Sequence, residues 1–287
     1  MILQSEILRI AEKEGVPPDT IDKNWVLGHF LAELFSNEWT KNKLVFKGGT
    51  CLKKCYFNDY RFSEDLDFTL TQKDFKITDA MIQSVCDAIF YKTGILFSDV
   101  KVDPCLWNNI LVGYKSQIPF WGSNHKKNQQ PTPYSRWQTK IKVEIICYEI
   151  LVQNPLTCPL YSDYSDNILF NNVKIPCYTL PEIIAEKFRS LLQRSYPAPR
   201  DYYDLWHLLI NKKLETLENI VQIFKKKIEY KQIAFLSYSD FFDIEQIKKI
   251  RKAWNNSLRN HLKENELPDF ELILSELKML CSNISWN

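Results

Sequence analysis

The stretch that most constrains this chain is residues 45–70, VFKGGTCLKKCYFNDYRFSEDLDFTL. An apolar run ending at Lys47 predicts a short strand, and the glycine pair within residues 48–50 predicts a turn. One or two helical turns and a loop should follow, before a second strand that opens with Asp65. The turn and the opening of this second strand are the two parts from which a function can be argued.

The second strand begins Asp65-Leu66-Asp67-Phe68. Because side chains alternate along a strand, both aspartates should project from one face while Leu66 and Phe68 enter the core. Two like charges side by side favour a cation between them. Hard divalent ions suit such a pair and take further oxygens from substrate phosphates. The pair predicts a site for Mg²⁺, with Mn²⁺ as the alternative ion. A solvated edge strand or a helix cap is the plainer explanation of the same acids.

The glycine turn has the properties of an anion site. Gly48 and Gly49 lack a β-carbon, so the backbone can approach a ligand closely, and the amides that open the following helix can hold a phosphate. Taken alone, this is also ordinary loop chemistry. A phosphate-holding turn followed about sixteen residues later by an aspartate pair indicates a nucleotide-transferring site.

The segments GGTCLKK and RFSEDLDF resemble the nucleotidyltransferase toxins of the AbiEii/AbiGii type, in the polymerase-β-like superfamily. That superfamily has a G-G/S-[ST] turn followed by a D-x-D strand. LPEIIAEKFRSLLQRSYPAPRDYYDLWHLL is similar to the family's second pair of motifs, a helical lysine and R-D-x-x-D-L, so the resemblance covers about residues 25–210. Cys51 departs from the pattern, because a small hydroxyl residue is common there.

The resemblance implies a nucleotide-binding role for Lys47, Gly48, Gly49, Thr50, Ser63, Lys187 and Arg200. Lys187 matches the lysine that contacts nucleotide phosphates in the family, although a lysine at the edge of a buried helix face can also snorkel or pair with an acid. Asp201 and Asp204 match the two aspartates of R-D-x-x-D and lie on the apolar stripe of their helix, so they need partners. Arg200 or Lys187 could hold one of them, and their separate catalytic roles stay open.

The superfamily also carries a third carboxylate on a neighbouring strand. In QTKIKVEIICYEI, Glu144 shares a face with Lys142 and interrupts an otherwise apolar strand, which makes it the residue we expect as third catalytic and metal ligand. Glu149 is the alternative. A solvent-facing position on an edge strand would explain Glu144 without a function.

Bulk properties limit the remaining possibilities. The net charge of +2 leaves any nucleic-acid surface to local patches. Three such patches are residues 121–137, residues 225–227 and residues 248–252 with nearby Trp254, and a solvated surface is the alternative for each. The eight cysteines lack C-x-x-C spacing. Cys51 and Cys55 lie on one helix face, where a disulfide is unfavourable, and no histidine cluster accompanies them for zinc. We therefore expect reduced thiols in a cytoplasmic protein, without a membrane span or signal peptide.

The resemblance implies an α+β fold: a polymerase-β-like mixed sheet flanked by helices in residues 1–178, then a helical C-terminal domain in residues 179–287 that completes the active site. Helices are expected at residues 3–14, 19–36 and 78–92, with residues 154–172 as a connection. The implied reaction moves a nucleoside monophosphate from an NTP to an acceptor. By analogy with the family, the acceptor is the 3′ end of tRNA, and the chain is the toxin of a bacterial toxin–antitoxin or phage-defence system with a cognate antitoxin. The alternatives are a protein or small-molecule hydroxyl as acceptor, or a non-catalytic relative that binds nucleotide or a partner.

Overall fold

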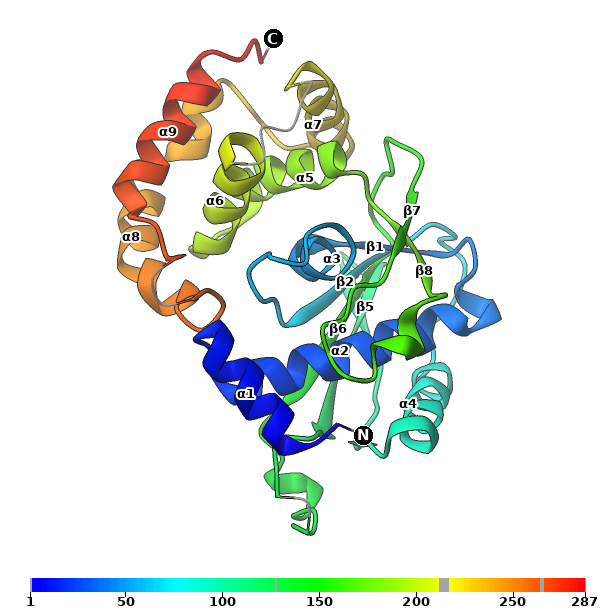
Figure 1. Cartoon of the computed structure of the whole chain (residues 1–287). Coiled ribbons are helices and arrows are strands. Elements are labelled where there is room, and N and C mark those ends of the chain that lie inside the picture. The colour runs from blue at the N-terminus through cyan, green and yellow to red at the C-terminus, as the bar shows by residue number, and fades with distance from the viewer. Residues whose placement is uncertain (1, 127, 212–216, 264–265, 287) are drawn as a thin grey trace. The chain divides into compact units, whose positions relative to one another are not determined.

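The computed structural model describes residues 2–126, 128–211, 217–263 and 266–286 (Figure 1). The chain divides into two compact units. The first comprises Met1–Glu149 with Pro155–Cys177, and the second comprises Ile150–Asn154 with Tyr178–Asn287. The division after Cys177 lies beside the boundary expected at 178, and the short segment Ile150–Asn154 belongs to the second unit.

The first unit is built on a mixed sheet whose strands follow the order β3-β5-β6-β2-β1-β8-β7, with β4 paired to β5. The strands are β1 (Leu44–Lys47), β2 (Asp65–Leu70), β3 (Leu96–Phe97), β4 (Asp103–Trp107), β5 (Ile110–Trp121), β6 (Lys140–Ile146), β7 (Leu156–Pro159) and β8 (Lys174–Cys177). The pairs β1/β8 and β2/β6 are parallel, and the other pairs are antiparallel. β2 and β6 therefore lie inside the sheet, and Glu144 is not on an edge strand.

The longer helices of the first unit are α1 (Gln4–Glu14), α2 (Pro18–Ser36) and α4 (Asp79–Thr93). The turn that follows β1 is α3 (Gly48–Cys51), which continues as a π-helical turn at Leu52–Tyr56. α1 packs on α2, and α2 packs on α4 and on the sheet (Figure 1). The rings of Phe35 on α2 and Phe68 on β2 are 6.0 Å apart. In β2, Leu66 and Phe68 are buried while Asp65 and Asp67 are only partly so, which confirms the predicted alternation.

Some local predictions were wrong. Asp19 lies in the first turn of α2 and does not cap it, because the helix begins one residue earlier, at Pro18. The expected connection at residues 154–172 contains β7, which pairs with β8. Asn108 and Asn109 do form a tight turn between β4 and β5, both with positive φ, which asparagine tolerates better than most residues.

The second unit is helical over the residues that the structure describes. Its helices are α5 (Leu180–Gln193), α6 (Pro199–Trp206) with a π-helical turn at His207–Asn211, α7 (Leu217–Lys231), α8 (Ile244–Leu258) and α9 (Phe270–Ser282). α5 packs against α7, and α6 packs against α8 and α9 (Figure 1). The ring of Phe188 lies 4.9 Å from that of Phe241 and 5.1 Å from that of Trp286, and these rings form part of the core. The predicted mixed sheet and helical C-terminal part are both confirmed.

Two of the three basic patches have a residue that is buried in the protein interior. Lys227 is fully buried, and Trp254 is buried with its indole N–H donating to the Pro268 carbonyl, so neither offers a surface for RNA. Arg251 pairs with Glu271 at 2.5 Å. In residues 121–137, Tyr134 is exposed, while Lys127 lies outside the described residues. Among the described helices, none is long and apolar enough to cross a membrane.

Candidate active site

A row of charged residues crosses four neighbouring strands of the first unit. In register, Lys47 of β1 is opposite Asp67 of β2, Asp67 is opposite Glu144 of β6, and Glu144 is opposite Lys115 of β5. Residues that pair in register share a face of the sheet. These four residues, called the charged row below, therefore lie on the face opposite the buried side chains of β2 and β6. Two acids thus lie side by side between two lysines.

Gly48, the first glycine of the turn, lies directly beside the Asp67 carboxylate. A β-carbon on Gly48 would lie 2.4 Å from Asp67 Oδ2, and Gly48 has φ +80°, which disfavours any other residue. A β-carbon on Gly49 would lie 2.9 Å from Arg61 Nη2 and 3.0 Å from Ser63 Oγ. The glycines are therefore required for close approach, and the contacted groups are the carboxylate, guanidinium and hydroxyl of a polar site.

Thr50 links the turn to the acidic strand. Its buried hydroxyl donates to the Asp65 carbonyl at 2.5 Å. This bond ties α3 to the start of β2, so the Thr50 side chain positions the aspartates. The lysines that follow in GGTCLKK also point inward, since Lys53 donates to the Asn58 carbonyl at 2.6 Å and Lys54 to Asn24 Oδ1 at 2.9 Å. Burial, with a smaller contribution from Lys53, lowers the pKa of Lys54 to about 7.

The acidic side chains have the chemistry of a divalent-cation site. Asp65 Oδ1 is a buried atom that has no hydrogen-bond partner within the described part of the chain, and Lys142 Nζ is 3.8 Å from it. A buried carboxylate oxygen left in this way fits a hard cation. The carboxylate oxygens of Asp65, Asp67 and Glu144 do not all lie within 4.8 Å of one another. Among the described residues, the only group of three potential ligand atoms that close consists of cysteine thiols.

Glu149, the alternative third carboxylate, lies beyond the end of β6 and is buried. It is therefore outside the register that places Glu144 beside Asp67. The geometry favours Glu144 as the partner of the aspartate pair.

The second unit contains a separate buried cluster built from the other predicted residues. Lys187 Nζ contacts Asp201 Oδ1 at 3.1 Å and Asp204 Oδ2 at 2.5 Å, and Arg194 Nη1 contacts Asp201 Oδ2 at 2.5 Å. Lys187 is on α5 and both aspartates are on α6, so the cluster also joins the two helices. Both acids of the R-D-x-x-D segment thus have Lys187 as a partner. Arg200 contacts His261 Nε2 at 2.9 Å.

Two polar residues of these sites were missed by sequence reasoning. Arg61 is buried beside Gly49, and Arg194 Nη1 donates a hydrogen bond to Asp201 Oδ2. A signal was present for Arg61, since it is a basic residue between aromatic residues, two positions before Ser63. Arg194 lies at the C-cap of α5, and its pairing depends on how α5 and α6 pack.

Two solved structures have a fold similar to that of this chain. The chain is similar to the nucleotidyltransferase toxin MenT4 from Mycobacterium tuberculosis H37Rv, with a TM-score of 0.59 and 18% identity over 98% of this chain and 99% of that chain. It is also similar to JHP933 from Helicobacter pylori, with a TM-score of 0.54 and 16% identity over 93% of this chain and 92% of that chain. At this identity the two structures establish the fold.

The family model described as "Nucleotidyl transferase AbiEii toxin, Type IV TA system" matches residues 29–276. The chain belongs to this family and is a nucleotidyltransferase of the toxin type, as its sequence motifs predict. No curated protein sequence matches it closely enough to count as a relative.

Proposed function

We propose that this nucleotidyltransferase moves a nucleoside monophosphate from an NTP to the 3′ end of an RNA, with tRNA as the favoured acceptor, and acts as a toxin that a cognate antitoxin restrains. The observation that carries the proposal is the contact between Gly48 and the Asp67 carboxylate, with Asp67 beside Glu144 in the charged row. Here a backbone that can approach a phosphate meets the acids that can hold a cation.

The charged row and Asp65 provide the groups for binding a metal-chelated triphosphate. Asp65, Asp67 and Glu144 would hold Mg²⁺ or Mn²⁺, which would offset triphosphate charge and lower the pKa of the acceptor hydroxyl. The backbone amides at Gly48 and Gly49, at the start of α3, are proposed to bind phosphate oxygens.

The polar groups beside the turn add further phosphate contacts. Ser63 Oγ donates a hydrogen bond to a phosphate oxygen, and the Arg61 guanidinium holds the turn and adds positive charge beside it. Lys47, opposite Asp67 in register, places a positive charge on the strand beside the carboxylate.

In the second unit we assign phosphate binding to Lys187, as its family motif implies. Asp201 and Asp204 hold the ammonium group in a fixed direction through two ion pairs. As negative charge develops on the leaving pyrophosphate, a fixed ammonium stabilises it more than it stabilises the bound NTP. Arg200, on the same helix as the two aspartates, is proposed to contact the nucleotide.

The RNA acceptor, the phage-defence role and a cytoplasmic location are parts of this proposal, made by analogy with the family. The type IV toxin–antitoxin description supports a cognate antitoxin. The exposed ring of Tyr134, with Lys126 and Arg136 nearby in the sequence, offers the stacking and phosphate contacts that a single-stranded RNA end requires.

The test is transfer of label from each of the four α-labelled NTPs, with Mg²⁺, to tRNA, to total protein and to a small-molecule alcohol. We expect label in tRNA, and sequencing of the RNA ends identifies the added base. Asp67→Ala should abolish labelling, whereas Asp74→Ala, which removes an exposed acid outside the site, should keep it. Label in protein with none in RNA would reject the proposed acceptor. Toxicity and labelling that both survive Asp67→Ala would reject the catalytic role.

A further inference from the structure

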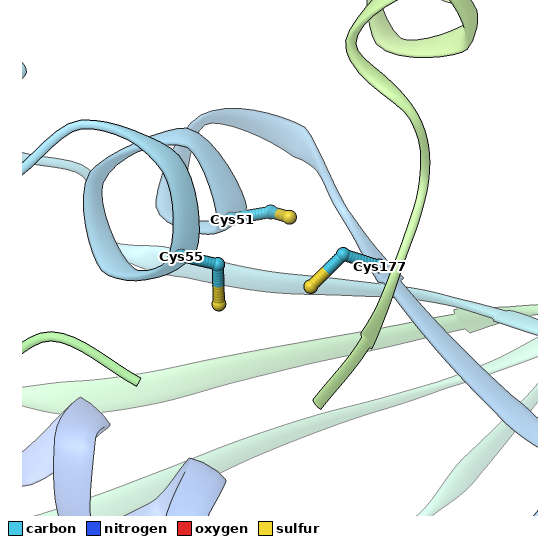
Figure 2. Close-up of side chains that lie close together, drawn as sticks. All are labelled: Cys51, Cys55 and Cys177. Atoms are coloured by element: carbon cyan, nitrogen blue, oxygen red, sulfur yellow. The ribbon is translucent and has the colours of Figure 1, made fainter. Parts of the chain in front are cut away.

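A cluster of cysteine thiols begins at Cys51, directly after the glycine turn, and has no role in the proposed transfer reaction. The sulfur atoms of Cys51, Cys55 and Cys177 all lie within 4.8 Å of one another, and each residue is buried. None of them forms a disulfide. Figure 2 shows the three side chains extending from two helical turns and one strand into the same space. Three ligand atoms from separate elements thus converge in the core of the first unit.

The fold brings together residues that are far apart in the sequence. Cys51 and Cys55 are four residues apart on consecutive helical turns and therefore share a face. Cys177 ends β8, where it pairs in register with Phe46 of β1, just before the glycine turn. The sequence expectation of no zinc site relied on local spacing. It missed this cluster because the third sulfur arrives through the pairing of β1 with β8.

A fourth thiol lies at the edge of the cluster. Cys158 of β7 pairs with Ile175 of β8, two residues before Cys177, so both cysteines lie on one face of the sheet. The Cys158 thiol shares hydrogen bonds with Cys177 and with the Tyr56 hydroxyl. The Cys158 sulfur therefore lies beside that of Cys177, outside the group of three that converges within 4.8 Å.

Cysteine binds a metal ion as the thiolate. An ion bound here would therefore replace the thiol protons of the cluster.

We propose that Cys51, Cys55 and Cys177, with Cys158 as the fourth ligand, bind a soft divalent cation of the Zn²⁺ type. Tetrahedral zinc with Zn–S bonds of about 2.3 Å separates its sulfur ligands by about 3.8 Å, which this convergence accommodates. Thiolates select such ions, whereas the carboxylates of the charged row select hard ions, so the two sites take different metals. Binding of the ion releases the thiol protons.

The role of this ion is structural. Cys51 directly follows the Gly48-Gly49-Thr50 segment, and Cys177 is on the strand beside β1, so the ion fixes the glycine turn to the sheet. A site with four protein ligands leaves no open position for substrate. This inference stands whether or not the chain modifies RNA.

Elemental analysis of the purified full-length chain tests the proposal directly. We expect about one zinc per chain in the wild type, as for a structural four-cysteine site. Cys177→Ser should lose it, while Cys86→Ser, which changes a buried thiol on α4 outside the cluster, should retain it. A wild-type chain without zinc, or the same zinc content in Cys177→Ser, would overturn the proposal.

A cobalt titration of the metal-stripped wild-type chain, kept reduced, covers the case in which Cys177→Ser fails to fold. A thiolate-to-cobalt charge-transfer band that saturates at about one equivalent is expected. The same band at lower intensity in Cys158→Ser would support the fourth ligand, and unchanged intensity would overturn that assignment. If no band forms, or mass spectrometry of the native chain finds a disulfide among these cysteines, the metal site is wrong.

Discussion

Asp65 of the first unit and Asp204 of the second are acids in different surroundings. The side chain of Asp65, beside the row, is 42% exposed, whereas that of Asp204 is fully buried against Lys187. An exposed acid is placed at little cost and remains available to a ligand. A buried acid is stable only with its partner, and removing either one leaves an uncompensated charge. Asp65 is therefore suited to binding a ligand, and Asp204 to holding Lys187 in position.

The sharpest test of this contrast is Lys187→Met, which keeps the volume and removes the charge. Asp201 and Asp204 would be left buried without the ammonium group, so we expect a loss of about 3–5 kcal/mol in the free energy of unfolding. Arg194→Met is the matched control, because it removes a half-exposed partner of Asp201 and should cost about 1 kcal/mol. Urea unfolding measures both. If both variants lose the same small amount of unfolding free energy, the buried Lys187 pairs and the half-exposed Arg194 pair do not differ in their contribution to stability.

Gly48→Ala tests whether the turn and the row form one unit. The new β-carbon would meet Asp67 Oδ2 at 2.4 Å in a backbone conformation with φ +80°, so we expect a cost of about 2–4 kcal/mol. NTP transfer should fall as the carboxylate is displaced. Gly28→Ala is the control, since its β-carbon would meet Lys54 Nζ and Phe170 at ordinary contact distances of 3.5 and 3.7 Å. Thermal unfolding and transfer assays that find the two variants alike would refute the contact.

Asp22 is a third case, a buried acid whose hydrogen bonds come from backbone N–H groups and not from a lysine. It accepts from the Ser123 N–H at 2.7 Å, and burial raises its pKa to about 6 from 3.8. The native state then binds a proton more tightly than the unfolded state, so stability falls as pH rises from about 4 to 6. Asp22→Asn should remove this slope and stabilise the chain by about 2 kcal/mol at pH 7. Unfolding measured across pH, with Asp74→Asn as control, checks the prediction. An unchanged slope contradicts it.

The smallest effect is expected for Lys142→Ala. Its ammonium lies 3.8 Å from Asp65 Oδ1, and both side chains are about half exposed. Such a pair contributes less than about 1 kcal/mol. Removing Lys142 leaves Asp65 with less positive charge, so Mg²⁺ should bind slightly more tightly, as a titration of transfer rate against Mg²⁺ would measure. Weaker Mg²⁺ binding would indicate that Lys142 supports the site.

The sequence predicts the parts of this site that depend on local repetition. Asp65 and Asp67 share a face because a strand repeats every two residues, and Lys187, Asp201 and Asp204 lie near the core side of their helices. Local pattern does not predict that Lys187 contacts both aspartates, because this contact depends on how α5 packs on α6. The meeting of Cys177 with Cys51 depends on the register of β1 and β8. Contacts of this kind come from the pairing of distant elements, and local pattern does not contain them.

The acids beside the glycine turn are proposed to perform the transfer, and Asp67→Asn removes one of their charges while it keeps the shape of the side chain. Single-turnover transfer from labelled NTP to RNA should slow by at least about 10³-fold in Asp67→Asn, with thermal unfolding unchanged. Asp74→Asn is the control. If Asp67→Asn transfers label as fast as this control, the acids do not perform the transfer.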